Sequence, residues 1–484
     1  MAETTTVALE TNLAEYVRQQ CGENVYLCYQ CKKCTAGCPV ADEMDYPPNE
    51  LMRLIQFGQW EKVLNCKTIW ICASCEACAT RCPMAIEIVR VMDVLKIAAQ
   101  ERGIKPPTTL PLMFNRAALR GINIFGRMYE LGLMAELKIR QTLTGQLDLA
   151  QIPWDAKLGI KMLTAGKLKL LPHAARTPKR LGPRQEPKTD PNTFALFPGC
   201  SFESTAAEYG MSTLAVAEAM GLKLEPPKGW VCCGTTPAHS TSHKLATLMP
   251  MRSLALAETQ GYTRMTVPCT GCYIRFMSAI HDVQHNPALA DEVAEELDGY
   301  RYTGALKVDH LLNTFTGDIG YEAIAAHVVK PLTGLKVVCY YGCVITRPPA
   351  ITGARHYEYP MNMDYLIRRL GAETLDWSYK TECCGVSLAF SELDIMLKLS
   401  QKILQNAKDV GAEAIVVACP LCQANLDGRQ SQMEARAGDK FNLPIIYFTE
   451  LMGLAFGLKP RDLGLQTKHL VNPMPLLKDK GLVS

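Results

Sequence analysis

Two cysteine runs with identical spacing constrain this chain more than any other feature. Each run reads Cys-x2-Cys-x2-Cys-x3-Cys-Pro. The first consists of Cys28, Cys31, Cys34 and Cys38, and the second of Cys72, Cys75, Cys78 and Cys82. Proline follows each run at the same place, as Pro39 and Pro83. A spacing repeated in this way, including its proline, indicates one structural unit used twice.

This spacing is that of bacterial two-cluster ferredoxins. A tight loop brings three thiolates to one four-iron cube, and the fourth thiolate, turned away by the proline, reaches the other cube. We therefore predict two [4Fe–4S] cubane clusters, one held by Cys28, Cys31, Cys34 and Cys82, the other by Cys72, Cys75, Cys78 and Cys38. Zinc is the alternative. Zinc sites, however, use cysteine pairs separated by longer loops and often histidine, and the first histidine here is His173.

The composition favours a globular redox protein. The 484 residues include 21 cysteines, with Lys+Arg 51 against Asp+Glu 48, so the charge gives no reason to expect a nucleic-acid partner. No apolar run reaches the length of about 18 residues that a membrane helix needs. Met1–Glu10 lacks the basic and apolar regions of a secretory signal. We expect a cytoplasmic protein, where thiols stay reduced and many cysteines indicate metal or redox chemistry.

The C-terminal part contains a second duplication. Each copy reads Cys, a long gap, Cys-Cys-Gly, another long gap and Cys-x2-Cys. The first copy has Cys200, Cys232, Cys233, Cys269 and Cys272, and the second has Cys343, Cys383, Cys384, Cys419 and Cys422. Apolar strands are predicted at 194–197, 265–267, 336–340 and 414–418, with helical segments at 254–261 and 404–411. Alternating strands and helices favour an α/β module.

Five thiolates from three loops at strand ends exceed what a cubane needs. The glycine after each adjacent pair permits a positive φ or a close backbone approach. Zinc and a redox-active dithiol are the alternatives, and neither explains five cysteines repeated with matched spacing. Cys21, Cys66 and Cys339 lie outside all four motifs.

These patterns predict an α+β fold, in which a mostly helical two-cluster ferredoxin-like domain precedes an α/β domain of two Cys-Cys-Gly modules. The expected units are the ferredoxin domain at 1–110, a helical extension at 111–171, a basic proline-rich linker at 172–191, the modules at 192–330 and 331–460, and a tail at 461–484. The linker is expected to be solvated, and docking of an acidic partner is the alternative.

Several fragments resemble heterodisulfide reductase. Leu196-Phe-Pro-Gly-Cys200, the Cys-Cys-Gly pairs and Cys339-Tyr-Tyr-Gly-Cys343 with Arg347-Pro348 resemble its B subunit. Gly126-Arg-Met-Tyr-Glu130 and Lys167-Leu-Lys-Leu-Leu-Pro172 resemble its C subunit. The order within one chain is similar to that of the fused D-type subunit, and the match runs from about residue 15 to about residue 455.

The resemblance implies that each five-cysteine set holds a noncubane [4Fe–4S] cluster and that a disulfide is cleaved between the two. One cluster takes Cys200, Cys232, Cys233, Cys269 and Cys272, and the other takes Cys343, Cys383, Cys384, Cys419 and Cys422. The chain is then expected to be the catalytic, sulfur-acting subunit of an oxidoreductase complex, with electrons entering through the ferredoxin pair. The alternative is a pure electron-transfer subunit of a larger dehydrogenase complex, without a disulfide of its own.

No glycine-rich phosphate loop is visible, so we expect no flavin or nicotinamide on this chain. The resemblance implies a flavin-containing A-type subunit or a membrane cytochrome as the electron donor, with peripheral attachment to the cytoplasmic face of the membrane through such a partner. His239 and His243 follow the first Cys-Cys-Gly and are candidate proton donors, with a core or surface position as the alternative. Arg347 is a candidate to pair with an anionic substrate group or a helix end.

Overall fold

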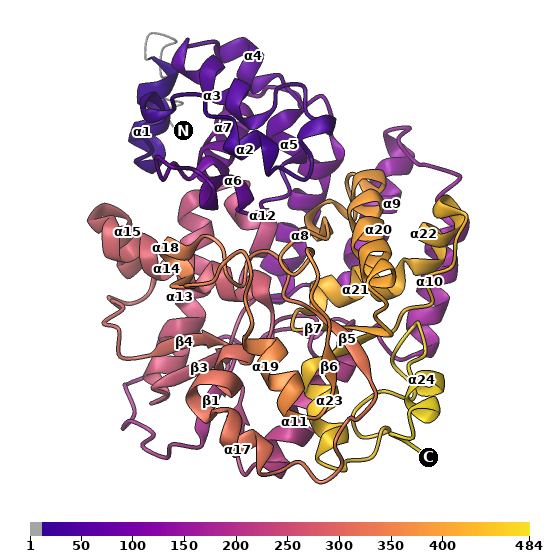
Figure 1. Cartoon of the computed structure of the whole chain (residues 1–484). Coiled ribbons are helices and arrows are strands. Elements are labelled where there is room, and N and C mark those ends of the chain that lie inside the picture. The colour runs from indigo at the N-terminus through magenta and orange to yellow at the C-terminus, as the bar shows by residue number, and fades with distance from the viewer. Residues whose placement is uncertain (1–11) are drawn as a thin grey trace.

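A computed structural model describes residues 12–484 of the protein. The stretch Met1–Glu10, on which the expectation about a targeting signal rests, lies outside the described residues. Figure 1 shows the N-terminal helices as a separate group at the top, with the two repeated modules beneath them. In residues 12–484 no helix is both long enough and apolar enough to cross a membrane.

The N-terminal group is helical and has its own core. Its helices include α1 (Leu13–Cys21), α3 (Pro48–Gln56), α4 (Trp60–Leu64), α5 (Thr68–Ile71) and α7 (Ile88–Glu101). Their buried faces pack together through residues such as Val17, Ile55 and Leu95, all fully buried. Gly58, with a φ of +67°, separates α3 from α4.

Two one-turn helices begin inside the cysteine runs. They are α2 (Lys33–Ala36) and α6 (Ala77–Thr80). The residues that precede them, Lys32 and Glu76, both have left-handed backbone conformations, with φ of +63° and +59°. The two runs therefore repeat a backbone shape as well as a spacing.

The middle of the chain forms α8 (Leu110–Phe125), α9 (Glu130–Leu143) and α10 (Ile152–Thr164). Residues 172–191 contain no helix or strand. Their basic side chains pair with acids of the first module: Arg184 contacts Glu258 and Lys188 contacts Glu225, each at 2.6 Å. Most residues of this segment are exposed and none is buried, so it faces solvent, while these two ion pairs attach it to the first module.

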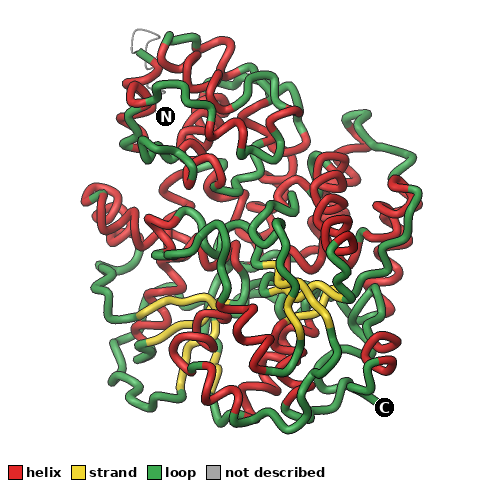
Figure 2. The backbone as a smooth tube through the Cα atoms, in the orientation of Figure 1, coloured by secondary structure: helices red, strands yellow, loops and turns green. Residues whose placement is uncertain are grey.

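The two modules have the same sheet topology. The first sheet has the order β2-β1-β3-β4 and the second β6-β5-β7-β8, with all neighbours parallel. The first contains β1 (Thr193–Leu196), β2 (Lys223–Glu225), β3 (Arg264–Val267) and β4 (Lys307–His310). The second contains β5 (Lys336–Tyr340), β6 (Glu373–Thr374), β7 (Ala414–Val417) and β8 (Ile445–Tyr447). Figure 2 shows these strands as two separate small sheets among helices.

The helices of each module flank its sheet. Those of the first are α11 (Ala207–Ala219), α12 (Thr235–His239), α13 (His243–Thr259), α14 (Thr270–His285), α15 (Pro287–Glu296), α16 (Leu311–Asn313) and α17 (Tyr321–Ala325). Those of the second are α18 (Pro349–Thr352), α19 (Asn362–Arg369), α20 (Leu393–Asp409), α21 (Pro420–Gly428), α22 (Gln430–Ala437), α23 (Phe448–Ala455) and α24 (Met474–Asp479). The helical segments predicted at 254–261 and 404–411 are the ends of the longer α13 and α20.

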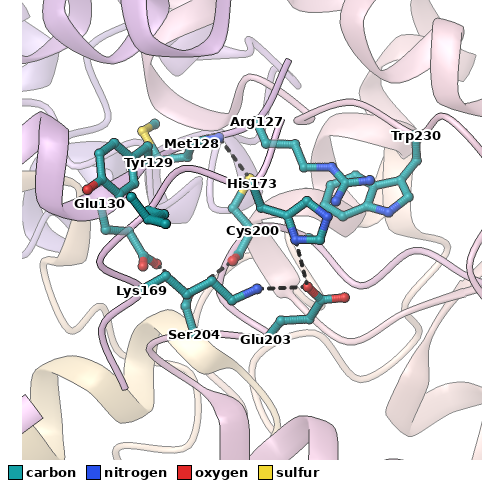
Figure 3. Close-up of a pocket in the computed structure, with 12 residues that line it drawn as sticks. Arg127, Met128, Tyr129, Glu130, Lys169, His173, Cys200, Glu203, Ser204 and Trp230 are labelled. Carbon is teal, nitrogen blue, oxygen red and sulfur yellow. Dashed lines mark hydrogen bonds and ion pairs between the residues drawn. The ribbon is translucent and has the colours of Figure 1, made fainter. Parts of the chain in front are cut away.

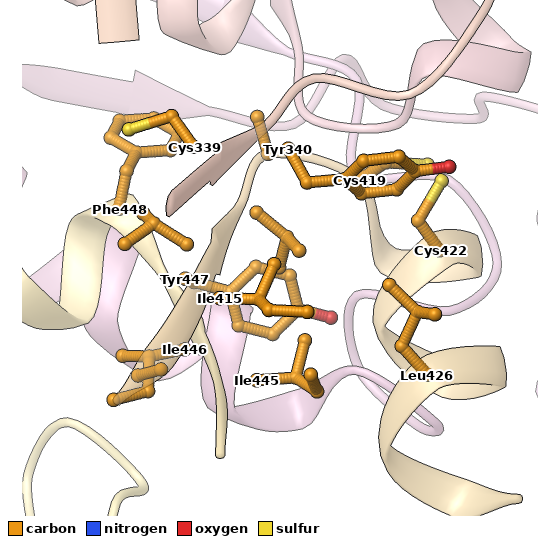
Figure 4. Close-up of a cluster of buried hydrophobic side chains, with 14 of the residues drawn as sticks. Cys339, Tyr340, Ile415, Cys419, Cys422, Leu426, Ile445, Ile446, Tyr447 and Phe448 are labelled. Carbon is orange, nitrogen blue, oxygen red and sulfur yellow. The ribbon is translucent and has the colours of Figure 1, made fainter. Parts of the chain in front are cut away.

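The core of the second module shows why these strands form. Ile415, Ile445 and Ile446 are β-branched and fully buried, as suits strands covered on both faces. Figure 4 shows them below Cys419 and Cys422, which lie where β7 ends. The carboxyl ends of parallel strands meet at one edge, so this topology gathers the cysteines that follow β1, β3, β5 and β7.

The predicted fold class is confirmed, and the four predicted strands agree with β1, β3, β5 and β7 to within one residue at each end. The sequence analysis missed β2, β4, β6 and β8, which have only two to four residues each. Strands this short carry too little periodicity to be recognised in isolation.

Candidate iron–sulfur sites

The first predicted ferredoxin set lines one cavity near the surface. Cys28, Cys31, Cys34 and Cys82 all border it. Cys31 is exposed, Cys34 is buried and the other two are partly buried. Gln30 donates a hydrogen bond from Nε2 to Cys28 Sγ at 3.3 Å. The structure thus brings the fourth cysteine of the second run to the first three of the first run.

The second set lies deeper. Burial raises the pKa of the Cys38 thiol to about 12, and the neighbouring Cys75 and Cys72 thiols act in the same direction. Cys78 is surrounded by Cys72, Cys75 and Cys38 in the same way. Cys38 therefore lies with the second run, in the crosswise arrangement that the sequence predicts.

The backbone conformation of both cysteine loops is suited to binding an anionic group. Gln30 and Lys32 in the first run, and Ser74 and Glu76 in the second, have positive φ values between 50° and 64°. Left-handed residues in a short loop turn successive N–H groups toward one side, which forms a concavity suited to an anionic group. A thiolate-bound cluster is such a group.

Each five-cysteine set is gathered at the carboxyl edge of its own sheet. Cys233 and Cys272 Sγ are 3.2 Å apart in the first module, and their counterparts Cys384 and Cys422 are 3.7 Å apart in the second. Contacts between Cys200 and Cys232, and between Cys343 and Cys383, complete each group. Equivalent pairs thus meet in both repeats.

Glycine is required before the first cysteine of each set. Gly199 and Gly342 have φ of +67° and +74°. A Cβ at these positions would lie 3.3 Å from Cys272 Sγ and 3.1 Å from Cys422 Sγ. A larger residue would be strained and would crowd the sulfur atoms.

The two five-cysteine sets touch each other. Thr270 Oγ1 of the first module donates a hydrogen bond to Cys419 Sγ of the second at 3.0 Å. The Cys269 and Cys419 thiols also interact directly. Nearby, α11 packs against α23, with Tyr209 stacked on Tyr447 at 4.1 Å between ring centroids.

The second set also touches the buried ferredoxin set, a contact that no pattern in the sequence predicts. The Cys75 and Cys383 thiols interact directly. Ser387 Oγ donates to the Ala73 carbonyl at 3.0 Å. Arg81, which precedes Cys82, binds the Glu358 carboxylate through two hydrogen bonds of 3.2 and 3.0 Å. The N-terminal group is therefore fixed against the second module at its cysteine loops.

A cavity opens beside Cys200, and Figure 3 shows the side chains around it. The Met128 amide donates to Cys200 Sγ at 3.3 Å, and Arg127 stacks on Trp230 at 3.8 Å. Lys169 Nζ lies 2.9 Å from a Glu203 carboxylate oxygen. Most of these residues come from the segments 126–130 and 167–173, so the middle of the chain supplies the wall of this cavity.

The candidate histidines pair with carboxylates of the chain. His239 is buried and its Nδ1 lies 2.7 Å from Asp93 Oδ2 of α7. His243 Nε2 lies 3.4 Å from Asp282 Oδ2. Arg347 is 1% exposed and binds Glu358 at 2.7 Å together with the Thr381 carbonyl, so its partners are groups of the chain itself.

The three cysteines outside the motifs are free thiols. Cys21 and Cys66 donate to the carbonyls of Val17 and Val63 within or near their own helices. Cys339 is fully buried inside β5.

Within residues 12–484, no three Cys, His, Asp or Glu side chains lie close enough to hold a single metal ion. A four-iron cluster is wider than one ion, and its ligand sulfurs stand farther apart than those of a zinc site. All four cysteine sets consist of free thiols, and one of them, Cys28, Cys31, Cys34 and Cys82, borders a cavity, so the sets fit such clusters in their chemistry.

Comparison with known proteins agrees with this donor chemistry. Residues 24–86 match the 4Fe-4S dicluster domain, and residues 194–277 and 337–427 each match the cysteine-rich domain family. The 8-methylmenaquinol:fumarate reductase membrane anchor subunit of Wolinella succinogenes is 31% identical over 56% of this chain and 95% of its own length. The chain belongs to the heterodisulfide reductase-like iron–sulfur family.

Two further relatives show how the family varies. The B subunit of the ferredoxin/F(420)H(2)-dependent CoB-CoM heterodisulfide reductase of Methanosarcina acetivorans is 26% identical over 57% of this chain and 94% of its own length. Lactate utilization protein A of Bacillus velezensis is 24% identical over 53% of this chain and 98% of its own length. The chain is an iron–sulfur electron-transfer protein of a family whose members include subunits of multisubunit reductases.

Proposed function

We propose that this chain relays electrons between a surface ferredoxin-type site and the paired Cys-Cys-Gly sites of a larger oxidoreductase complex. The contact between Cys75 and Cys383 carries this proposal, because it joins the N-terminal group to the repeats at cysteines of both. Together with the closeness of Cys34 to Cys38 and the contact between Cys269 and Cys419, it makes a continuous series of four cysteine sets.

When bound, two cubane and two noncubane [4Fe–4S] clusters would supply one-electron carriers at these four sets. The side chains determine where electrons can enter and leave. Exposed Cys31 makes its set accessible to a partner, whereas buried Cys75 and Cys383 keep the next step away from solvent. The paired contacts of Arg81 with Glu358 hold the two groups at a fixed separation.

The names of the relatives support a proposal about the partner subunit and the location of this chain. The Wolinella protein is named a membrane anchor subunit. We propose that this chain, too, works beside other subunits, with a flavin-containing subunit as electron donor and attachment to a membrane surface through a partner. The unit boundaries expected from the sequence remain part of this proposal.

Reduction of a small-molecule disulfide is the second candidate, and the cavity beside Cys200 favours it. Arg127, Lys169 and His173 line this cavity together with Glu130 and Glu203, and Lys169 and His173 pair with Glu203, so the cavity offers polar groups of both signs beside Cys200. Both five-cysteine motifs are complete, and one relative is named a heterodisulfide reductase subunit. The substrate sulfur would approach Cys200, whose set in turn contacts the second set through Cys269 and Cys419.

One experiment separates the two candidates. The full chain is purified anaerobically, its iron, sulfide and zinc are measured, and it is reduced with dithionite. Oxidised glutathione, cystamine or the quinone menadione is then added while EPR spectra are recorded. About 16 irons per chain, with reoxidation by menadione and no disulfide-dependent signal, support the relay. A signal that requires a disulfide supports the second candidate. About 8 irons, or zinc in the repeats, refutes both.

A further inference from the structure

The contact between the two repeats is chemically asymmetric. Thr270 directly follows Cys269, and the equivalent residue after Cys419 is Pro420. The Thr270 hydroxyl donates a hydrogen bond to Cys419 Sγ at 3.0 Å and is 3% exposed. Proline has no donor, so Pro420 cannot return this bond to Cys269. The fourth cysteine of the second set receives a cross-module hydroxyl that the first set lacks.

A second pair of equivalent positions carries different donors in the two repeats, an imidazole N–H in the first and a phenol O–H in the second. His310 is the last residue of β4 and is aligned with Val267, two residues before Cys269. Tyr447 is the last residue of β8 and is aligned with Val417, two residues before Cys419. Both side chains are fully buried. His310 thus occupies in the first repeat the place that Tyr447 occupies in the second.

The proton on His310 has a defined position. The Leu312 amide donates to His310 Nδ1 at 3.2 Å, so Nδ1 is the acceptor and Nε2 carries the hydrogen. His310 Nε2 makes no hydrogen bond of ordinary geometry within residues 12–484. The groups close to this ring are the carbonyls of Pro268 and Ala418, which directly precede the two facing cysteines, and the Cys419 thiol. A buried imidazole N–H dipole beside Cys419 stabilises negative charge on that sulfur.

We propose that Thr270, through its hydroxyl hydrogen bond to Cys419, and His310, through its buried N–H dipole beside Cys419, raise the reduction potential of the second Cys-Cys-Gly site. Both are positioning residues contributed by the opposite repeat. The inference rests on the proposed function, because it requires the second cysteine set to hold a cluster.

The physical reason is electrostatic. A reduced site carries one more negative charge than an oxidised site, and donors aimed at its sulfur atoms stabilise that charge. The second site, which electrons would reach through Cys75 and Cys383, would therefore hold an electron more tightly than it would without these donors. Two side chains that are not themselves ligands make this difference.

The test is an EPR-monitored redox titration of the anaerobically purified full chain. Thr270→Val removes the hydroxyl with little change in shape, and Thr270→Ser restores it. His310→Asn keeps an acceptor for the Leu312 amide but withdraws the Nε2 donor. Thr247→Val is the matched control, since the Thr247 hydroxyl is buried in the same module but donates to the His243 carbonyl within α13 at 3.2 Å.

We expect Thr270→Val and His310→Asn each to lower one midpoint potential by about 59 mV, the equivalent of a tenfold change in a one-electron equilibrium. Thr270→Ser and Thr247→Val should leave all midpoints at their wild-type values. Unchanged midpoints in both test variants, with wild-type iron content, overturn the inference and leave the proposed relay intact. A wild-type protein with only about 8 irons overturns the inference together with the proposed function.

Discussion

Replacing Lys380 by methionine removes one partner of an ion pair that lies entirely inside the second module. Lys380 Nζ is 2.6 Å from Asp364 Oδ1, and both side chains are 0% exposed. The other carboxylate oxygen accepts the Tyr341 hydroxyl at 2.7 Å. Tyr341 lies two residues before Cys343 and Lys380 three before Cys383, so the pair joins two of the ligand loops.

The expected loss of stability follows from the burial of this ion pair. Removing one partner of a buried pair costs about 3–5 kcal/mol, because the remaining charge has neither water nor a counter-ion. A loss of 1 kcal/mol lowers the unfolding midpoint by about 2–4 °C in units of 150–250 residues. Lys380→Met should therefore lower the midpoint by about 6–20 °C. The double variant Lys380→Met, Asp364→Asn should recover more than half of this loss, since the asparagine is neutral and still accepts from Tyr341.

The chain offers a control with the same geometry on its surface. Lys398 Nζ and Glu43 Oε1 are also 2.6 Å apart, but the side chains are 60% and 30% exposed. An exposed pair contributes about 0–1 kcal/mol, so Lys398→Met should have little effect. The assay is anaerobic thermal unfolding followed by far-UV circular dichroism at one scan rate, with iron content measured in parallel. The reasoning would be refuted if the unfolding midpoint of Lys380→Met lay within about 2 °C of wild type. It would also be refuted if the double variant unfolded at a lower temperature than Lys380→Met alone.

The remaining predictions concern the ferredoxin sets and two buried titratable groups. Cys82→Ser and Cys38→Ser should each remove about four irons. Each variant identifies one EPR signal of the wild type, namely the signal that disappears in that variant. A dissolved dysprosium chelate should enhance the relaxation of the Cys82 signal more strongly than that of the Cys38 signal, because the Cys82 set borders the surface cavity. Burial raises the pKa of Glu130 from 4.5 to about 7, so the folded state keeps a proton that the unfolded state loses. Wild-type stability relative to Glu130→Gln should therefore fall by up to about 3 kcal/mol between pH 4.5 and 7, measured by denaturant unfolding at several pH values. The Glu450 carboxylate holds the pKa of buried His469 at about 9, above its ordinary 6.5. The stability difference between wild type and His469→Gln should thus be largest below pH 6.5 and shrink as pH rises to about 9; a constant difference would exclude this pair as its source.

Much of the candidate site could be predicted because it depends on local spacing. The cysteine runs fix which thiols share a loop, and the proline after each run predicts the crosswise positions of Cys38 and Cys82. The strands that precede Cys200, Cys269, Cys343 and Cys419 are apolar runs of ordinary length, so they were located to within a residue. Their topology then gathers the cysteines at one edge of each sheet.

Other features depend on segments that are distant in the sequence. The edge strands β2 and β6 are two or three residues long and are defined by pairing with β1 and β5 rather than by any pattern of their own. Most of 172–191 faces solvent, but the ion pairs of Arg184 and Lys188 with acids of the first module have no signal in the sequence. For His239 the sequence left open a proton donor or a core or surface position, and the fold buries it beside Asp93 of α7.

The sequence by itself determined the four cysteine sets, the duplication of the repeats and the fold class, because each is a periodic or locally spaced property of the chain. Only the tertiary structure decided which sets adjoin. The contacts of Cys75 with Cys383 and of Thr270 with Cys419 join segments more than a hundred residues apart, and they arise from the packing of whole modules. Such packing depends on the shape of buried faces summed over many residues, which no local spacing encodes.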